Sequence, residues 1–262
     1  MLGTGASFTR TLGFRLGMLL SIAILPIGMI SILQTLHLSR EAERSSEIAI
    51  QGRTAAAAAG ERALLQGAIG TADALGSSVL ALLGDQAACS EMMRDFVQRS
   101  ATFVYAGFTT IEGRNTCSSG NRVVDLSGSP HFQAFMQNPG TLITATQSGA
   151  VSRQSVVIVS QPLYRDQELL GYVAVSLSHD LLLSTHATAY LSDGARIVTF
   201  NSAGQALVGD FGNGSDPAGI LPQGMTLDSL IPLTDTTFRA TSNSGEQRVF
   251  SVVRSEERRV GK

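Results

Sequence analysis

Four histidines and two cysteines are the side chains of this sequence best suited to metal or redox chemistry. The histidines show no HxH or HExxH spacing, and the cysteines, 28 positions apart, form no CxxC pair. The six residues are His37, His131, His179, His186, Cys89 and Cys117. A zinc site needs ligands of these types at close spacing. We therefore expect no metal site and no cofactor.

The sequence also lacks the patterns of common enzyme classes. It has no GxSxG nucleophile elbow, no P-loop and no GxGxxG motif after a strand. Its 262 residues carry a net charge of −2 and include only 15% charged residues. A nucleic-acid-binding domain normally has a basic patch or stripe. We expect a non-catalytic chain, not an enzyme, with no nucleic acid partner.

The elements that position these residues begin with an apolar N-terminal segment. Eighteen residues without a charge, LGMLLSIAILPIGMISIL, run from Leu16 to Leu33, and the uncharged stretch continues through Ser39. About 20 such residues span the hydrocarbon core of a bilayer, so residues 16–36 are predicted to form a transmembrane helix. A cleaved signal peptide and a buried soluble helix are the alternatives. A signal peptide has a shorter apolar core and a small-residue cleavage site.

The charges that flank this segment predict its orientation. Arg10 and Arg15 precede it, and the first acidic residue is Glu41. Cytoplasmic flanks of membrane helices are rich in Lys and Arg. Residues 1–15 are therefore expected in the cytoplasm, and the residues after about 36 on the other side of the membrane.

Residues 37–84 have the composition of one long helix. Ala, Leu, Glu, Gln and Arg dominate, and proline is absent. Glycines weaken the helix at five positions, so a break or kink is allowed for. A shorter helix is predicted from Asp85 or Ala87 to Arg99. Apolar residues of the long segment recur at helical spacing at Ala57, Leu64, Ala68, Ala72, Leu75, Val79 and Leu82.

After residue 100 the pattern changes to strands. A hairpin is predicted from 103–111 and 116–119, and a second one from the apolar runs 155–163 and 169–177. Between them, Ser129-Pro130 opens a short helix, HFQAFMQ, because proline is favoured in a first turn. A further strand region begins at Gly140.

A second, less complete series of strands follows. Residues 188–191 and 196–201 are predicted to pair, 209–224 to form a loop, and 237–241 and 247–253 to form a last hairpin. The fold class is therefore α+β, with two antiparallel-sheet modules at 85–183 and 184–253. The second module is expected to be incomplete.

Four segments of the sequence resemble the double Cache sensor domain of bacterial transmembrane receptors. They are DLSGSPHFQAFMQ (125–137), VVIVSQPLYRDQELLGYVAVSLSHDLL (156–182) and the pair GDQAACSEMM and GRNTCSS. The cysteine-bearing pair is similar to a subgroup attached to sensor histidine kinases. The resemblance implies that the two modules are PAS-like and that the chain is the input region of a sensor histidine kinase. It also implies an anchor in the inner membrane, a periplasmic part that binds a small-molecule ligand, and a homodimer. A diguanylate cyclase, a chemoreceptor and an anchored binding protein without an output domain are the alternatives.

In this resemblance, the first module holds the ligand. A small polar ligand needs a few placed charges and an aromatic wall, and Arg153 could clamp a carboxylate. A capping Asp125, a solvated Arg153 and core tyrosines are the structural alternatives. Ser129 stands where the family often has arginine, and His131 where it often has an aromatic residue, so an amino-acid-binding pattern is not carried over. The candidate ligand-binding residues are Tyr105, Asp125, His131, Phe132, Arg153 and Tyr172.

The two cysteines are expected to form a disulfide if this region lies outside the cytoplasm. Disulfides persist in such oxidising compartments, and this one would join the short helix to the first hairpin. Two unpaired thiols, buried as small apolar groups, are the alternative.

The last nine residues, RSEERRVGK (254–262), look like the translation of a sequencing adapter. On this interpretation the natural sequence continues past Val253, and residues 254–262 are excluded from fold reasoning. A natural charged tail is the alternative.

Overall fold

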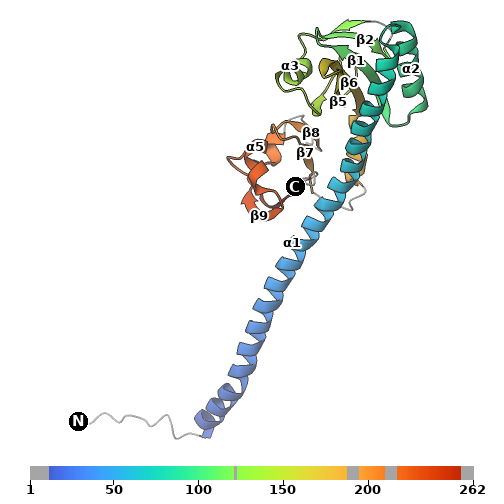
Figure 1. Cartoon of the computed structure of the whole chain (residues 1–262). Coiled ribbons are helices and arrows are strands. Elements are labelled where there is room, and N and C mark those ends of the chain that lie inside the picture. The colour runs from blue at the N-terminus through green and yellow to red at the C-terminus, as the bar shows by residue number, and fades with distance from the viewer. Residues whose placement is uncertain (1–11, 121–122, 188–194, 210–216, 255–262) are drawn as a thin grey trace. The chain divides into compact units, whose positions relative to one another are not determined.

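The computed structural model describes residues 12–120, 123–187, 195–209 and 217–254. Its first element is the helix α1 (Leu12–Leu82), which runs from blue to cyan in Figure 1. α1 continues over 71 residues, and none of its glycines ends it. The chain divides into two units, residues 1–50 and 51–262, which are taken separately below.

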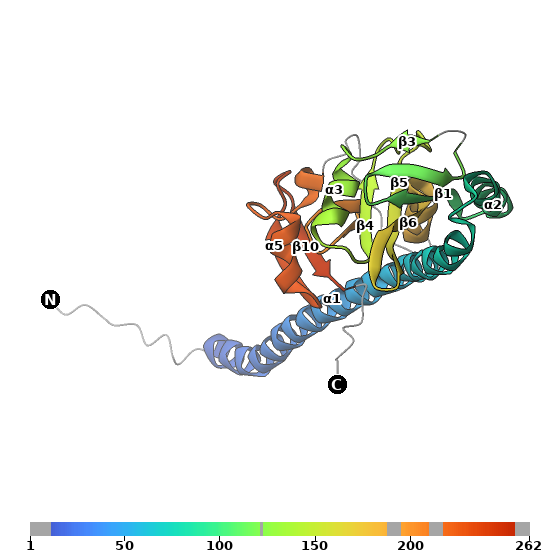
Figure 2. The same cartoon turned by 45° about the horizontal axis from the view of Figure 1, so that its top comes forward.

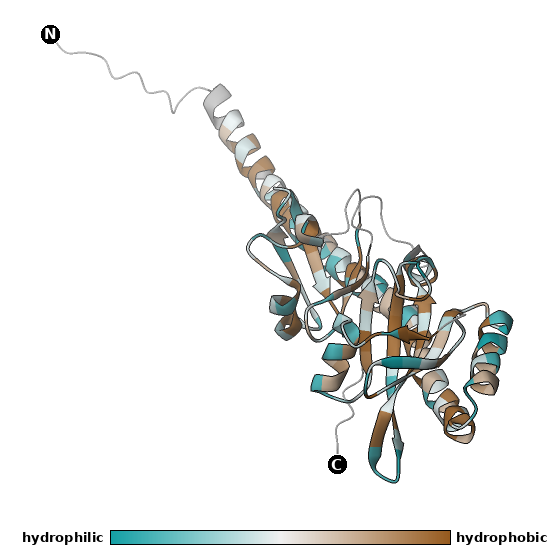
Figure 3. Ribbon diagram, turned by 90° about the horizontal axis from the view of Figure 1, so that it is seen from above, coloured by the Kyte–Doolittle hydropathy of each residue, from teal (hydrophilic) through white to brown (hydrophobic). Residues whose placement is uncertain are grey.

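The first unit consists of the N-terminal part of α1. Its large apolar side chains are exposed; Leu19 and Leu25, for example, are each 67% exposed. Figure 3 shows hydrophobic residues along this helix. Among the described residues, α1 is the one helix long and apolar enough to cross a membrane.

A six-stranded antiparallel sheet forms the centre of the second unit, in the order β3-β2-β1-β6-β5-β4. The two predicted hairpins are present as β1–β2 and β5–β6. β1 and β6 also pair with each other, which joins the hairpins into one sheet. The strands are β1 (Phe103–Thr110), β2 (Arg114–Ser118), β3 (Val124–Asp125), β4 (Leu142–Thr146), β5 (Val156–Arg165) and β6 (Glu168–Ser178).

Three helices accompany this sheet: α2 (Gln86–Arg99), α3 (Pro130–Gln137) and α4 (His179–Ala187). α2 begins where the Asp85 carboxylate accepts a hydrogen bond from the Ala88 amide at 3.0 Å. α3 begins where the Ser129 hydroxyl accepts one from the Phe132 amide at 3.2 Å, with Pro130 in the first turn. Both helices lie where the sequence predicts them.

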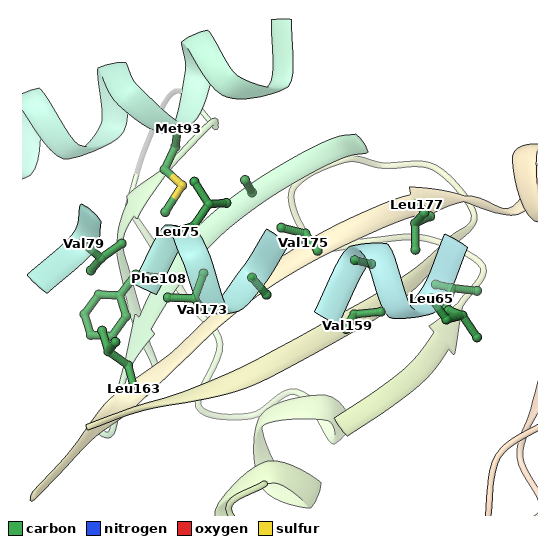
Figure 4. Close-up of a cluster of buried hydrophobic side chains, with 14 of the residues drawn as sticks. Leu65, Leu75, Val79, Met93, Phe108, Val159, Leu163, Val173, Val175 and Leu177 are labelled. Carbon is green, nitrogen blue, oxygen red and sulfur yellow. The ribbon is translucent and has the colours of Figure 1, made fainter. Parts of the chain in front are cut away.

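The C-terminal half of α1 packs on one face of the sheet (Figure 4). Ala68 and Ala72 are completely buried, and these small residues let the helix lie close to the strands. At Gly76 a Cβ atom would be only 3.1 Å from Leu163 of β5. The predicted apolar face is confirmed: Leu64 and Leu82 are partly buried and pack against the core, the other predicted residues are buried, and Leu65 is buried in addition.

The rest of the chain forms a second, smaller core. The short strands β7 (Val198–Phe200) and β8 (Ala206–Gly209) pair, as do β9 (Thr236–Thr241) and β10 (Gln247–Val252), with the one-turn helix α5 (Leu227–Leu230) between the pairs. Two short 3-10 segments, Pro217–Ile220 and Ile231–Leu233, complete it. Its buried residues are Leu221, Leu227, Leu230 and Val252.

The sequence predicts two strand pairs in this C-terminal region. The β9–β10 hairpin is confirmed. The strand expected at 188–191 lies outside the described residues, and β7 pairs with β8, a strand that the sequence analysis did not predict. β8 was missed because its segment is only four residues long. The α+β fold class is confirmed.

Candidate functional site

The two faces of the six-stranded sheet differ in chemistry. Successive side chains of a strand point to opposite faces. Val173, Val175 and Leu177 of β6 belong to the core under α1. Tyr172 and Ala174 belong to a separate cluster on the opposite face. The register also places apolar residues such as Leu142 and Ile158 on that opposite face. Among its polar residues we name eight the polar face: Tyr105, Thr109, Asn115, Ser118, Thr144, Ser160, Tyr172 and Ser176.

Most of the polar face is deeply buried. Thr109, Asn115, Ser118, Ser160 and Ser176 are each at most 3% exposed. A buried hydroxyl or amide costs free energy unless it is hydrogen-bonded. Such a concentration within a sheet whose other face is apolar therefore marks a candidate site.

Helix α3 covers this face of the sheet, and Figures 1 and 2 both show the sheet between α3 and α1. Phe132 and Phe135 are buried against Tyr172 and Ala174. The ring centroids of Phe135 and Tyr172 are 4.7 Å apart, and those of Phe132 and Tyr172 are 6.4 Å apart. Tyr172 is therefore the residue of β6 against which the aromatic side chains of α3 pack.

Hydrogen bonds of His131 join α3 to the strands β4 and β5. Its Nδ1 lies 2.6 Å from the Thr144 hydroxyl of β4, and its Nε2 lies 2.7 Å from the Ser160 hydroxyl of β5. A neutral imidazole donates one hydrogen bond and accepts the other, and a hydroxyl can serve either nitrogen. Burial lowers the pKa of His131 to about 4, so the ring is neutral at pH 7.

Tyr105 occupies the space that Gly107 leaves on β1. A Cβ atom at Gly107 would stand 2.3 Å from the Tyr105 hydroxyl, so this position requires glycine. Burial raises the pKa of Tyr105, and hydrogen bonding by Asn115 and Ser118 only partly opposes that rise. The phenol is therefore a neutral hydrogen-bonding group within the polar face.

Asn115 joins β2 to β1 through its side chain. Its amide nitrogen donates to the Phe108 carbonyl at 3.1 Å and to the Thr109 hydroxyl at 3.2 Å. Its Oδ1 is buried, and no described residue donates a hydrogen bond to it. This oxygen is an acceptor available to a donor group of a bound molecule.

Four of the six predicted site residues come together here. Tyr105 and Tyr172 lie on the polar face, and His131 and Phe132 of α3 cover it. The His131 and Tyr172 rings make an edge contact with centroids 5.6 Å apart.

The other two predicted residues lie elsewhere. Asp125 is exposed and pairs in register with Arg114, so it faces away from Asn115. Its carboxylate accepts a hydrogen bond from the Ser127 amide at 2.9 Å, which lowers its pKa. Arg153 is exposed in the turn between β4 and β5, at a φ of 54°.

The sequence analysis missed the small polar residues of the site. Thr109, Asn115, Ser118, Thr144, Ser160 and Ser176 were not singled out. Serine and threonine in a strand usually mark a solvent-facing side. The alternation of apolar and polar residues in β6, together with a helix α3 packed on the polar side, was the signal that could have shown these residues to be buried.

The two cysteines lie on the opposite side of the sheet. Cys89 of α2 and Cys117 of β2 form a disulfide with a Cα–Cα distance of 5.5 Å, and both are buried in the core under α1. The bond joins the short helix to the first hairpin.

The site offers hydroxyl, amide and imidazole hydrogen-bonding groups beside aromatic rings. This combination suits the binding of a small polar molecule. The described residues contain no group of three His, Cys, Asp or Glu side chains that could hold a metal ion.

Comparisons with known proteins connect this architecture to sensory domains. No protein-family model and no curated protein matches the sequence. Among solved structures, the extracellular domain of rpHK1S-Z16, described as a histidine kinase, matches with a TM-score of 0.65 and 19% identity, over 79% of this chain and 88% of that one.

Two further structures extend the range of receptor types. The sensory domain of the Campylobacter jejuni chemoreceptor Tlp3, with isoleucine bound, has a TM-score of 0.53 and 13% identity, over 80% of this chain and 88% of that one. A domain of a sensory box/GGDEF family protein from Vibrio parahaemolyticus has a TM-score of 0.53 and 12% identity, over 81% and 92%. At these identities the likeness concerns fold alone. The chain has the fold of Cache-like extracellular sensory domains.

Proposed function

We propose that this chain is the ligand-sensing, membrane-anchored input region of a bacterial signal-transduction receptor. One observation carries the proposal: a sheet face of buried hydroxyl and amide groups lies under a single short helix, in a domain with a sensory fold. A purely structural sheet would gain stability from apolar residues at these positions.

The ligand is a small molecule that contacts Tyr105, His131, Phe132 and Tyr172. Asn115 presents its buried Oδ1 as an acceptor, and the aromatic rings supply a wall. Similar domains have been solved with isoleucine and with GABA bound, which supports a small polar ligand. The roles predicted for Asp125 and Arg153 stay predictions.

Residues 16–36 anchor the chain in the inner membrane. Residues 1–15 lie in the cytoplasm, the residues after about 36 lie in the periplasm, and 37–84 form the signalling segment, which α1 covers as far as Leu82. The apolar, exposed side chains of α1 and the arginines before them support this arrangement. Residues 85–183 form the membrane-distal module and 184–253 the membrane-proximal one.

Protease treatment of intact spheroplasts tests this topology. Cleavage is expected to remove most of the polypeptide and to leave a short membrane-bound fragment. A chain that stays whole until the cells are lysed would place it on the cytoplasmic side.

Ligand binding acts on the long helix of a homodimer. A ligand shifts the balance between two helix positions only through its different affinity for them, typically by about 1–3 kcal/mol. The output is a histidine kinase in the complete receptor. The resemblance of the two cysteine-bearing segments to a subgroup attached to sensor histidine kinases supports this choice over a GGDEF protein or a chemoreceptor.

A thermal-shift screen of the full chain in detergent or nanodiscs tests ligand binding. The probes are amino acids, organic acids and amines, each at millimolar concentration. At least one compound is expected to raise the melting temperature, because a ligand that binds only the folded state stabilises it.

A matched pair of variants then locates the binding site. Thr109→Val removes a hydroxyl from the polar face, and Thr110→Val makes the same change one position along, on the opposite face. Affinity for the compound should fall about fivefold in the first variant, because Asn115 loses the hydroxyl that accepts its hydrogen bond and one buried hydrogen bond is worth about 1 kcal/mol. It should stay within about twofold in the second. Equal affinities in both would place the site elsewhere.

A further inference from the structure

A carboxylate and an imidazole are buried together away from the polar face. Glu61 of α1 is 2% exposed and His186 of α4 is 6% exposed. The His186 Nε2 lies 3.1 Å from the Glu61 Oε2. The Thr199 hydroxyl of β7 donates to the same carboxylate oxygen at 2.5 Å. Three elements that are distant in sequence therefore meet at one oxygen atom.

The β7–β8 hairpin, which supplies Thr199, connects the two cores. Leu207 and Val208 of β8 pack in the core under α1. Val198, Phe200 and Ala206 of the same hairpin pack against the smaller C-terminal core. A displacement of the C-terminal core therefore reaches the β7–β8 hairpin directly.

The hairpin is also fastened to the large sheet. The side-chain amide of Asn201 donates to the Ile143 carbonyl of β4 at 3.1 Å. This contact is neutral and lies at the hairpin turn. The contact through Thr199 differs because it ends on α1 and involves a buried charge.

The buried carboxyl group of Glu61 needs hydrogen-bond partners at suitable positions. A buried carboxylate is costly unless nearby groups pair with it and donate to it. Its second oxygen, Oε1, is buried, and no described residue donates a hydrogen bond to it. His186 and Thr199 are therefore its partners among the described residues. A shift of β7 or α4 relative to α1 would weaken both contacts at once.

We propose that Glu61, beside the Arg62 hydrogen bond to the Arg254 carbonyl and the packing of β8, is a residue through which movement of the C-terminal module is passed to the long helix. The inference rests on the proposed function only in taking α1 as the element that carries movement toward the membrane. The contact itself is independent of which ligand binds the polar face.

Hydrogen–deuterium exchange of the full chain tests this role without any ligand. Glu61→Gln keeps the shape of the side chain and removes its charge. Glu41→Gln is the matched control, because Glu41 also faces a histidine on α1, His37 at 3.6 Å, but in an exposed pair. Exposed pairs contribute little, whereas breaking a buried one is costly.

In Glu61→Gln, residues 196–209 should exchange at least about tenfold faster, whereas Val173–Leu177 of β6 should stay within about twofold of the parent. Glu41→Gln should leave both segments unchanged. A uniform increase in all segments would reduce Glu61 to a general stabilising role and overturn the proposal. Unchanged exchange at 196–209 would overturn it as well.

A milder variant covers the case in which Glu61→Gln does not fold. Thr199→Val removes one donor and leaves the contact between Glu61 and His186 in place. Faster exchange confined to 196–209, by about threefold to tenfold, is expected from the loss of one hydrogen bond. Unchanged exchange there would contradict the proposal. Neither result depends on the ligand screen, so failure here and failure of the proposed function are separate outcomes.

Discussion

The two faces of the six-stranded sheet use the same strands for different purposes. On β6, Val175 and Leu177 are completely buried against α1, whereas Ser176 between them is buried on the opposite face. The apolar face holds the long helix through close packing. The polar face is covered in part by α3, a helix of eight residues, which His131 joins to β4 and β5.

This difference indicates how stability and binding are divided in the domain. Apolar burial contributes about 25 cal/mol for each Å² removed from water, so the α1 side supplies most of the free energy of folding. The polar face gains less free energy from burial, and its hydroxyl and amide groups can exchange one hydrogen-bond partner for another. Substitutions on the two faces should therefore affect different measurements.

The largest expected effect comes from the apolar face. Leu177→Ala should lower the free energy of unfolding by about 3–5 kcal/mol, because it leaves a cavity in a fully buried site. Its neighbour Ser176→Ala should cost about 1 kcal/mol at most. Urea denaturation of both variants measures the difference, and equal losses would remove the distinction between the faces.

Loss of the disulfide should come next. Replacing both Cys89 and Cys117 by serine frees a loop between residues 28 positions apart, which the chain-entropy relation values at about 3–4 kcal/mol. Because both cysteines lie in the core under α1, the affinity for a ligand should change little. A double variant as stable as the parent, or one with lost affinity, would contradict this assignment.

The polar face should respond to acid through His131. The pKa of His131 falls from its ordinary value of 6.5 to about 4 in the folded chain. Between these pH values the unfolded chain binds a proton that the folded chain does not, so stability decreases as the pH falls. The loss amounts to at most about 3 kcal/mol.

Thermal unfolding at pH 7, 5.5 and 4 measures this dependence. His131→Gln keeps a hydrogen-bonding side chain without a titrating group, so its curve should be flatter over this range. A parent and a variant with parallel curves would show that His131 is not the group responsible.

The smallest effect is expected at Arg153. It is exposed in the turn before β5, so Arg153→Gln should change stability by no more than about 0.5 kcal/mol. If it lies outside the site, calorimetric titration should give an unchanged affinity. A clear loss would add Arg153 to the binding residues and place a charge at the edge of the polar face.

The sequence predicted most elements of the fold, with exceptions such as β3, β8 and α5, but only part of the site. Helical spacing predicted the face of α1, and the Ser129-Pro130 pair predicted the start of α3. Both signals are local. Four of the six predicted ligand residues meet because aromatic and histidine side chains flank the strongest motifs.

The site residues that the sequence did not indicate come together through strand pairing and contacts between distant segments. Asn115 and Ser160 join the site only through strand register, and a polar residue in a strand is ambiguous until the cover of its face is known. Glu61 and His186 meet across 125 positions. No local pattern shows that a glutamate on a polar-looking helix turn will be buried.

The most direct test of the account uses hydrogen–deuterium exchange of the full chain, with and without the compound that gives the largest thermal shift. Protection is expected in three segments that border the polar face: residues 105–118, 131–137 and 172–176. Protection confined to residues 198–252, with no change in these three segments, would contradict the claim that the polar face binds the ligand.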